Sequence, residues 1–366
     1  MRSRRERLAA LAERERVETV LVCGENRTGS GVAWLTGWPV TAEAVALFDS
    51  RRPGALFVQY HNHLPLARRL ARDFEVRWGG PSTLDALEGE LLERKATRLG
   101  VIGPLAAAKQ RRLAQRHELV DLNAHYTRLR LIKSPEEIDW VRLGAWLSDR
   151  AVDALRREAR AGLDERSLWR ICENAYVGEG GTTWIHYFGA TSMAAPDCCV
   201  PAQYPSSRKL QQGDALFCEI SAQFWDYPGQ VLRSFTVGAA PARLYRDLYA
   251  AAEAAFGAML AVVKAGASVR ELVEAASCIE RAGFTTCDDL AHGFVGGYLP
   301  PVLGSASRPA GPVPEMALEA GMTLVLQPNV VTPEGRAGVQ IGELVLVTET
   351  GHERLHQVPM EFFRLD

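Results

Sequence analysis

The residues most able to do chemistry lie on two extended runs joined by a turn, between positions 213 and 238. Residues 215–224 and 231–237 are apolar and β-prone, and the Asp-Tyr-Pro-Gly sequence at 226–229 is typical of a turn. In such a hairpin, polar residues near the strand ends can face each other. Glu219 and Gln230 are the side chains best placed to do so. We expect both to point into one cavity, where Glu219 would bind a cationic group or orient a catalytic histidine.

Three later stretches belong with this hairpin: residues 290–296, 321–329 and 338–349. The first contains His292, and imidazole is the side chain that ordinarily titrates near neutral pH, which makes it the natural general acid or base. Gln327 ends an apolar run in the second stretch, and its amide can both donate and accept hydrogen bonds to a substrate. The plainer interpretation of His292 is a structural histidine held beside a glycine turn.

Together, these four stretches resemble the C-terminal domain of the creatinase, prolidase and methionine aminopeptidase family, which has the pita-bread fold. The resemblance rests on four motifs, in order: Glu219, ten residues, then Gln230-Val-Leu-Arg-Ser; His292-Gly-Phe-Val-Gly; Gly321-Met followed by a strand and Gln327-Pro-Asn; and Gln340-Ile-Gly-Glu before Val-Leu-Val-Thr-Glu. It implies an α+β fold for residues 129–366. It also implies that residues 1–128 form a smaller α/β domain of the creatinase N-terminal type, because residues 31–38 resemble a segment of that domain.

The departures from the family pattern bear on the chemistry. The family's metalloenzymes supply Asp, Asp, His, Glu and Glu to two divalent ions, and the matching residues here are Glu219, Gln230, His292, Gln327 and Gly342. Divalent cations in such sites need anionic oxygen ligands. Glu343 is adjacent to the lost fifth ligand, but a shift of one residue along a strand reverses the face. We therefore predict no bound metal and no other cofactor, and we keep Glu343 as a candidate for substrate binding.

The proton-shuttling positions of the family are also vacant. The histidine that the resemblance places before the hairpin in creatinase is Ala202 here, and the second histidine of the peptidases falls on Leu299. His186, within an apolar run, is the replacement that we predict for the catalytic group. Further candidates for substrate binding are Tyr227 and Arg233 in the hairpin, together with His61 and His63 in the N-terminal domain. In the family, the N-terminal domain often closes the partner's active site, so we predict a homodimer in which these two histidines reach across.

Composition excludes several classes of function. The chain has 366 residues, a formal net charge of -2 and 47% hydrophobic residues, which gives no reason to expect a nucleic acid or an anionic membrane as partner. No apolar run reaches transmembrane length, and the basic start is not followed by the apolar segment of a secretory signal. Seven scattered cysteines, an odd number, favour reduced thiols in the cytoplasm.

Strands that alternate with helices predict an α/β domain at the N-terminus. The second domain begins with a helix-start signature, in which Ser134 caps a helix, Pro135 takes its first position and Glu137 completes a capping box. Helical periodicity predicts helices at 135–161, 165–178, 243–264 and 269–282. These helices would cover a curved antiparallel sheet.

The function that the sequence favours is hydrolysis of a C–N bond in a small polar substrate without a metal ion. Three alternatives stay open: a non-catalytic pseudo-peptidase that binds a ligand, an Xaa-Pro-type metallopeptidase with one unorthodox metal, and a lyase or C–C cleaving enzyme on the same fold.

Overall fold

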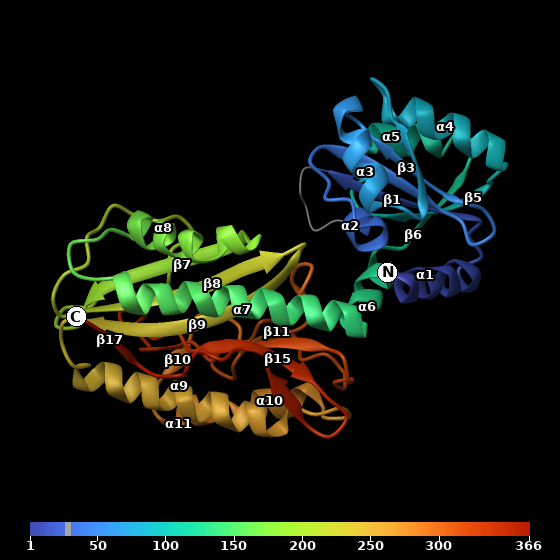
Figure 1. Cartoon of the computed structure of the whole chain (residues 1–366). Helices are drawn as coiled ribbons and strands as arrows, with labels where there is room; N and C mark the ends of the chain where they lie inside the picture. Colours follow the sequence, from blue (N-terminus) through green and yellow to red (C-terminus); the bar gives the residue numbers. More distant parts are fainter. Residues whose placement is uncertain (26–30) are drawn as a thin grey trace. The chain divides into compact units, whose positions relative to one another are not determined.

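The computed structural model describes residues 1–25 and 31–366, and the chain divides into two compact units, Met1–Arg130 and Leu131–Asp366. Each unit has its own sheet, helices and hydrophobic core (Figure 1).

The N-terminal unit is an α/β domain around a six-stranded sheet with the order β4-β3-β2-β1-β5-β6. Strands β1 and β2, and β2 and β3, pair antiparallel, whereas the β3–β4, β1–β5 and β5–β6 pairs are parallel. The strands are β1 (Thr19–Glu25), β2 (Glu43–Phe48), β3 (Gly54–Val58), β4 (Phe74–Trp78), β5 (Arg98–Ile102) and β6 (Glu118–Asp121). The helices are α1 (Arg2–Arg14), α2 (Gly31–Thr36), α3 (Leu64–Leu70), α4 (Thr83–Arg94), α5 (Ala107–Leu113) and α6 (Asn123–Leu131), with a 3₁₀ turn, η1, at His61–His63.

The C-terminal unit is built on a large sheet in which β12, β11, β13, β15, β9, β8 and β7 lie side by side, with β16 on β15 and β17 on β9. The long strands are β7 (Thr182–Ser192), β8 (Asp214–Phe224) and β9 (Tyr227–Val237), and all the pairs along the main path are antiparallel. The shorter strands are β11 (Ala291–Gly293), β12 (Leu299–Leu303), β13 (Thr323–Leu326), β15 (Gly342–Val347), β16 (His352–Arg354) and β17 (Phe363–Leu365). A separate pair joins β10 (Thr285–Thr286) to β14 (Val330–Val331).

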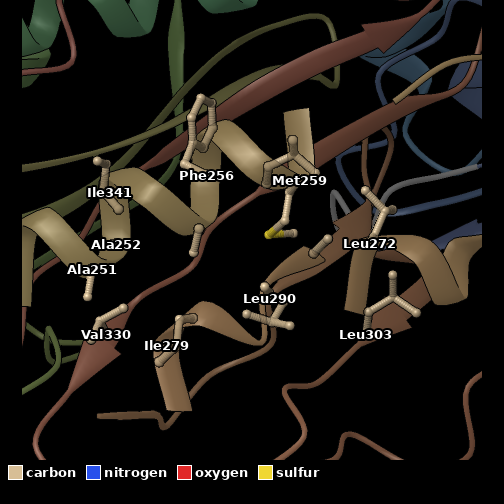
Figure 2. Close-up of a cluster of buried hydrophobic side chains, with 14 of the residues drawn as sticks. Ala251, Ala252, Phe256, Met259, Leu272, Ile279, Leu290, Leu303, Val330 and Ile341 are labelled. Atoms are coloured by element: carbon tan, nitrogen blue, oxygen red, sulfur yellow. The ribbon is translucent and has the colours of Figure 1, made fainter. Parts of the chain in front are cut away.

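Helices cover this sheet in two groups, as Figure 1 shows. One apolar cluster joins α7 (Pro135–Glu158) and α8 (Glu165–Tyr176), which the turn η2 (Val177–Glu179) follows, to β7, β8 and β9. The other joins α9 (Arg243–Val262), α10 (Val269–Ala275) and α11 (Cys278–Arg281) to β13 and β15. Figure 2 shows this second cluster, to which Phe256 and Met259 of α9 belong together with Leu290 and Leu303. This mixed architecture confirms the fold class that the sequence predicted.

Local sequence accounts for the start of α7. The Ser134 side chain accepts from the backbone N–H of Glu137, and the Glu137 side chain accepts from the N–H of Ser134, so the predicted capping box is confirmed. The predicted helix at 269–282 is wrong in its extent, because the structure divides it into α10 and α11.

The hairpin turn also differs from the prediction. The turn consists of Trp225 and Asp226, both with positive φ, whereas Tyr227, Pro228 and Gly229 already belong to β9. Positive φ at both central residues is the geometry of a type I′ hairpin turn. Gly229 serves close packing instead, because a Cβ there would lie 2.2 Å from the Ala145 Cα of α7.

Candidate active site

A cavity of about 420 Å³ lies in the C-terminal unit, above the central strands of the large sheet. Its lining comes from β7, β8, β9, β11 and the residue that follows β13, and from the segments 200–203, 287–288 and 294–298. The lining residues are Trp184, Ile185, Tyr187, Val200, Pro201, Gln203, Glu219, Gln230, Cys287, Asp288, His292, Phe294, Tyr298 and Gln327. Among the described residues, this lining contains carboxyl, amide and aromatic groups but no Lys or Arg.

The predicted polar floor of the cavity is formed by Glu219, Gln230 and Gln327. Gln230 donates from Nε2 to Glu219 Oε1 at 2.6 Å and to Gln327 Oε1 at 3.1 Å. Both hydrogens of the Gln230 amide are thus used within the site. The expectation that Glu219 and Gln230 point into one cavity is confirmed.

Two aspartates that the sequence analysis missed extend this network. Gln327 donates from Nε2 towards Asp288 Oδ2 at 3.3 Å and Asp289 Oδ1 at 3.4 Å, and Asn329 donates to Asp288 Oδ2 at 3.4 Å. Tyr298 gives a shorter bond, 2.5 Å from its hydroxyl to Asp289 Oδ1. The signal that could have found this pair is the Cys-Asp-Asp run directly before the apolar strand that carries His292.

His292 lies on β11 with its ring almost completely buried. Its Nδ1 lies 3.1 Å from the Gly293 carbonyl oxygen and so carries the proton, which makes Nε2 the lone-pair nitrogen. Nε2 makes no hydrogen bond of good geometry with any described residue. Tyr298 stacks on the imidazole, with ring centroids 3.9 Å apart. The turn that returns Tyr298 to this position has positive φ at Val295 and at the two glycines that follow it.

Burial shifts the pKa values of Glu219 and His292 in opposite directions. Burial raises the pKa of Glu219 to about 8, and the nearby carboxylates of Asp288 and Asp289 act in the same direction. Burial lowers the pKa of His292 to about 4. His292 is therefore neutral near pH 7, which differs from the sequence-based expectation of a histidine that titrates near neutrality.

Asp288 is also perturbed. Burial raises its pKa to about 6, and the neighbouring carboxyl group of Asp289 adds to this shift. Around neutral pH, Asp288 is thus mainly ionised, whereas Glu219 is mainly protonated. Among the described residues, the hydrogen bonds to this acidic wall come from neutral side-chain amides, the backbone N–H of Asp289 and the Tyr298 hydroxyl group.

The side chains at the family's metal positions do not fit a metal pair. The amide N–H groups of Gln230 and Gln327 donate to the carboxylates of the site, so they occupy the oxygen lone pairs that a cation would need. At the fifth position, a Cβ on Gly342 would lie 2.4 Å from the Leu326 carbonyl oxygen, so the backbone fills the space of a ligand side chain. Among the described residues, no group of three or more His, Cys, Asp or Glu is arranged to hold a metal ion.

Glu343 and Arg233 lie outside the lining of the cavity, and the prediction that they bind substrate is corrected. Both are completely buried, with Arg233 Nη2 2.9 Å from Glu343 Oε2, and Arg354 bonds the same carboxylate from the other side. The guanidinium group also donates to the carbonyl oxygens of Gly342, Val358 and Pro359. This cluster joins β9, β15 and the C-terminal segment, so its role is structural.

His186 also lies outside the cavity, so the prediction that it is catalytic is corrected. It follows Ile185 and precedes Tyr187, which both line the cavity, and alternation along the strand turns it towards α8. There its Nε2 lies 2.7 Å from the Tyr176 hydroxyl, and its ring packs against Trp169. Burial lowers its pKa to about 4.

Three remaining candidates have other surroundings. Tyr227 donates to Glu137 Oε1 at 3.0 Å and lies outside the lining of the cavity, so it ties β9 to α7 instead of binding substrate. His61 packs edge-on against Trp78, and His63 contacts Trp38, both within the N-terminal unit. The role of His61 and His63 in a partner's site stays a prediction.

Comparison with known proteins identifies the family. The model of metallopeptidase family M24 matches residues 140–349, more than half of the chain. The chain belongs to this family. It is therefore a peptidase-like hydrolase by descent, and its pita-bread fold is that of the family.

Individual relatives of this M24 protein carry several names. An Xaa-Pro dipeptidase of Pyrococcus furiosus is 26% identical over 64% of this chain and 65% of its own. An ectoine hydrolase of Halomonas elongata is 24% identical over 66% of this chain and 62% of its own. Among solved structures, an Xaa-Pro dipeptidase from Bacillus anthracis is 21% identical, covers 99% of both chains and has a TM-score of 0.84. That last likeness shows the fold alone.

The helices of residues 1–25 and 31–366 were compared with the requirements for crossing a membrane. None of these helices is both long enough and apolar enough to span a bilayer.

Proposed function

We propose that this protein hydrolyses a C–N bond in a small polar molecule without a bound metal ion. The observation that carries this proposal is the direction of the hydrogen bonds at the family's metal positions. Gln230 and Gln327 donate to Glu219 and the two aspartates, so neutral amides hold together the carboxylates that a cation would otherwise join.

The opposed pKa shifts of Glu219 and His292 support a division of roles between an acid and a base. A pair of titratable groups whose pKa values are pushed apart by their surroundings supplies both proton donor and acceptor near neutral pH. Neutral His292 would accept a proton through Nε2 from the water that attacks the carbon atom. Protonated Glu219 would deliver a proton to the departing nitrogen, which leaves as an amine. Loss of the His292 proton to solvent and uptake by Glu219 would restore the site.

The amides have a positioning role in this proposal. Gln230 fixes Glu219, and Gln327 fixes Asp288 and Asp289, while both amides also line the cavity and so contact the substrate.

The first test is metal content followed by turnover. Protein purified without chelator is analysed for metals and then incubated, with and without EDTA, with small amides, amidines, ectoine and Xaa-Pro dipeptides. Mass spectrometry detects products that have gained one water. We expect substoichiometric metal and turnover that EDTA does not change. The activity should be lost in Glu219→Gln and His292→Asn, but kept in Asp247→Asn, which alters an exposed carboxylate on α9.

Each alternative gives a different result. One tightly held ion per chain with EDTA-sensitive turnover would replace this proposal with a single-metal peptidase. Ligand binding without turnover would indicate a pseudo-peptidase, and fragments that sum to the substrate mass without added water would indicate a lyase.

A further inference from the structure

We propose that Cys199 and Cys287 form a reversible disulfide when the protein meets a hydroperoxide, and that this bridge ties together two segments of the cavity wall. The modification would occur whichever reaction the cavity performs, so it goes beyond the proposed function. Both residues are free thiols and both are only partly buried, so a small oxidant can reach them.

The backbone brings the two cysteines to the same place. Cys287 directly follows β10, and β10 pairs with β14 so that Thr285 lies opposite Val331. Val331 also bridges to Gly338, and a Cβ on Gly338 would lie 2.3 Å from the Cys199 carbonyl oxygen. Cys199 and Cys287 therefore adjoin the same short piece of backbone, although they lie far apart in the chain.

The side chains complete the pair. The Cys287 thiol donates a hydrogen bond to Cys199 Sγ, which lowers the pKa of Cys199 to about 7 and raises the pKa of Cys287. The positive charge of Arg308 acts on Cys199 in the same direction. The thiolate is the form of cysteine that oxidants attack, and a neighbouring thiol converts the product to a disulfide. Cys199 is thus the attacking group and Cys287 the resolving group.

The oxidation balances with one molecule of hydrogen peroxide. The Cys199 thiolate attacks one peroxide oxygen and the O–O bond breaks, so that Cys199 becomes a sulfenic acid while hydroxide leaves and takes a proton from solvent. The Cys287 sulfur then attacks the sulfenic sulfur. The S–S bond forms, the S–O bond breaks, and the thiol proton leaves with the hydroxyl group as water. Two thiols lose the two electrons that the peroxide gains, and an added dithiol reverses the step by exchange.

This bridge would join two parts of the cavity lining that belong to different segments. Val200 and Pro201 directly follow Cys199 in the lining, whereas Cys287 lines the cavity beside Asp288. Segments that carry cavity residues outside the long strands can open locally without unfolding of the sheet. A covalent link between them should restrain that opening.

Cys198 offers a matched control on the same segment. It is also partly buried, but its Sγ donates to the Val200 carbonyl oxygen at 3.1 Å, and burial raises its pKa. Cys198 therefore shares the position and the exposure of its neighbour without the stabilised thiolate. At pH 7, iodoacetamide should alkylate Cys199 at least tenfold faster than Cys198.

The test treats the full chain with hydrogen peroxide, blocks the remaining thiols with iodoacetamide and identifies bridged peptides by mass spectrometry. Wild type and Cys198→Ser should both give a bridge between Cys199 and Cys287 that dithiothreitol removes. Cys199→Ser should give none. In Cys287→Ser, which serves if that variant does not fold, Cys199 should stop as a sulfenic acid that dimedone traps. Hydrogen exchange in residues 198–203 and 286–289 should slow on oxidation of wild type but not of Cys287→Ser.

Several results would overturn the proposal. These are a bridge that includes Cys198 in place of Cys199, no bridge at peroxide concentrations that oxidise free glutathione, or equal alkylation of Cys198 and Cys199. Unchanged hydrogen exchange after complete bridging would refute the tie between the two segments of the wall.

Discussion

Glu219→Gln should make the protein more stable at neutral pH while it abolishes turnover. The raised pKa of Glu219 means that the folded protein holds a proton that the unfolded chain releases. Stability from this proton is fully present below the ordinary pKa of 4.5 and is lost as the pH rises through about 8. Glutamine resembles the protonated acid in shape and can still accept the hydrogen bond from Gln230, but it has no charged form.

The magnitude follows from the shift. Each pKa unit corresponds to about 1.36 kcal/mol, and the window between 4.5 and pH 7 covers roughly two and a half units. Keeping the proton on the buried carboxyl group at pH 7 therefore lowers the unfolding free energy of the wild type by roughly 3 kcal/mol relative to the glutamine variant. The gain in unfolding free energy of Glu219→Gln over the wild type should shrink towards zero as the pH falls to 4.5.

The assay is urea unfolding of the wild type and the variant at several pH values between 4.5 and 8. The difference in unfolding free energy between the two proteins should grow steadily with pH. The matched control is Glu349→Gln, which alters an exposed carboxylate beyond β15. A difference for Glu219→Gln that stays constant across this range, or a variant less stable than wild type at pH 7, would refute the assignment of a raised pKa.

Three further substitutions test the surroundings of the site. Glu343→Gln should lower the unfolding free energy by roughly 3–5 kcal/mol in urea titrations, because the buried Arg233 would lose its carboxylate, and a cost under about 1 kcal/mol would contradict this role. Gly342→Ala should cost roughly 1–3 kcal/mol, since the new Cβ would press on the Leu326 carbonyl oxygen, and an unchanged melting temperature would show that the backbone leaves room there. Wild-type stability should fall as the pH drops from 6.5 to about 4, because the unfolded chain protonates His186 before the folded one does; circular dichroism should show a smaller loss in His186→Gln, and an equal loss would rule out this histidine as the cause.

The hairpin was the part of the site most readable from the sequence. Two apolar runs with one turn between them bring Glu219 and Gln230 together almost wherever the exact turn lies, so the error in the turn did not harm the prediction of their meeting. His292 and Gln327 lie too far along the chain from the hairpin for a local pattern to show that they meet it. The spacing of the family motifs predicted that they belong to the same site.

The face of a strand was harder to predict. His186 and Tyr187 alternate on β7, and which of them faces the cavity depends on the pairing of Tyr187 with Glu219 and on the irregularity between Thr183 and Ile185. No local pattern in the sequence contains that register. Asp288 was missed for a related reason: it lies in a loop, and only the tertiary structure brings it to Gln327.

The residues at the family's metal positions give this site a chemistry different from that of a metal pair. Of the five matching residues, Glu219 alone retains a carboxyl group, while Gln230 and Gln327 present N–H donors that a metal ion cannot use. A site that had simply lost its metal would be expected to lose its acidity too. This one keeps Glu219 and adds Asp288 and Asp289, which are held in place by those same donors. The combination keeps acidic groups in the cavity but replaces the anionic ligands of a metal pair with amide groups that donate hydrogen bonds to those acids.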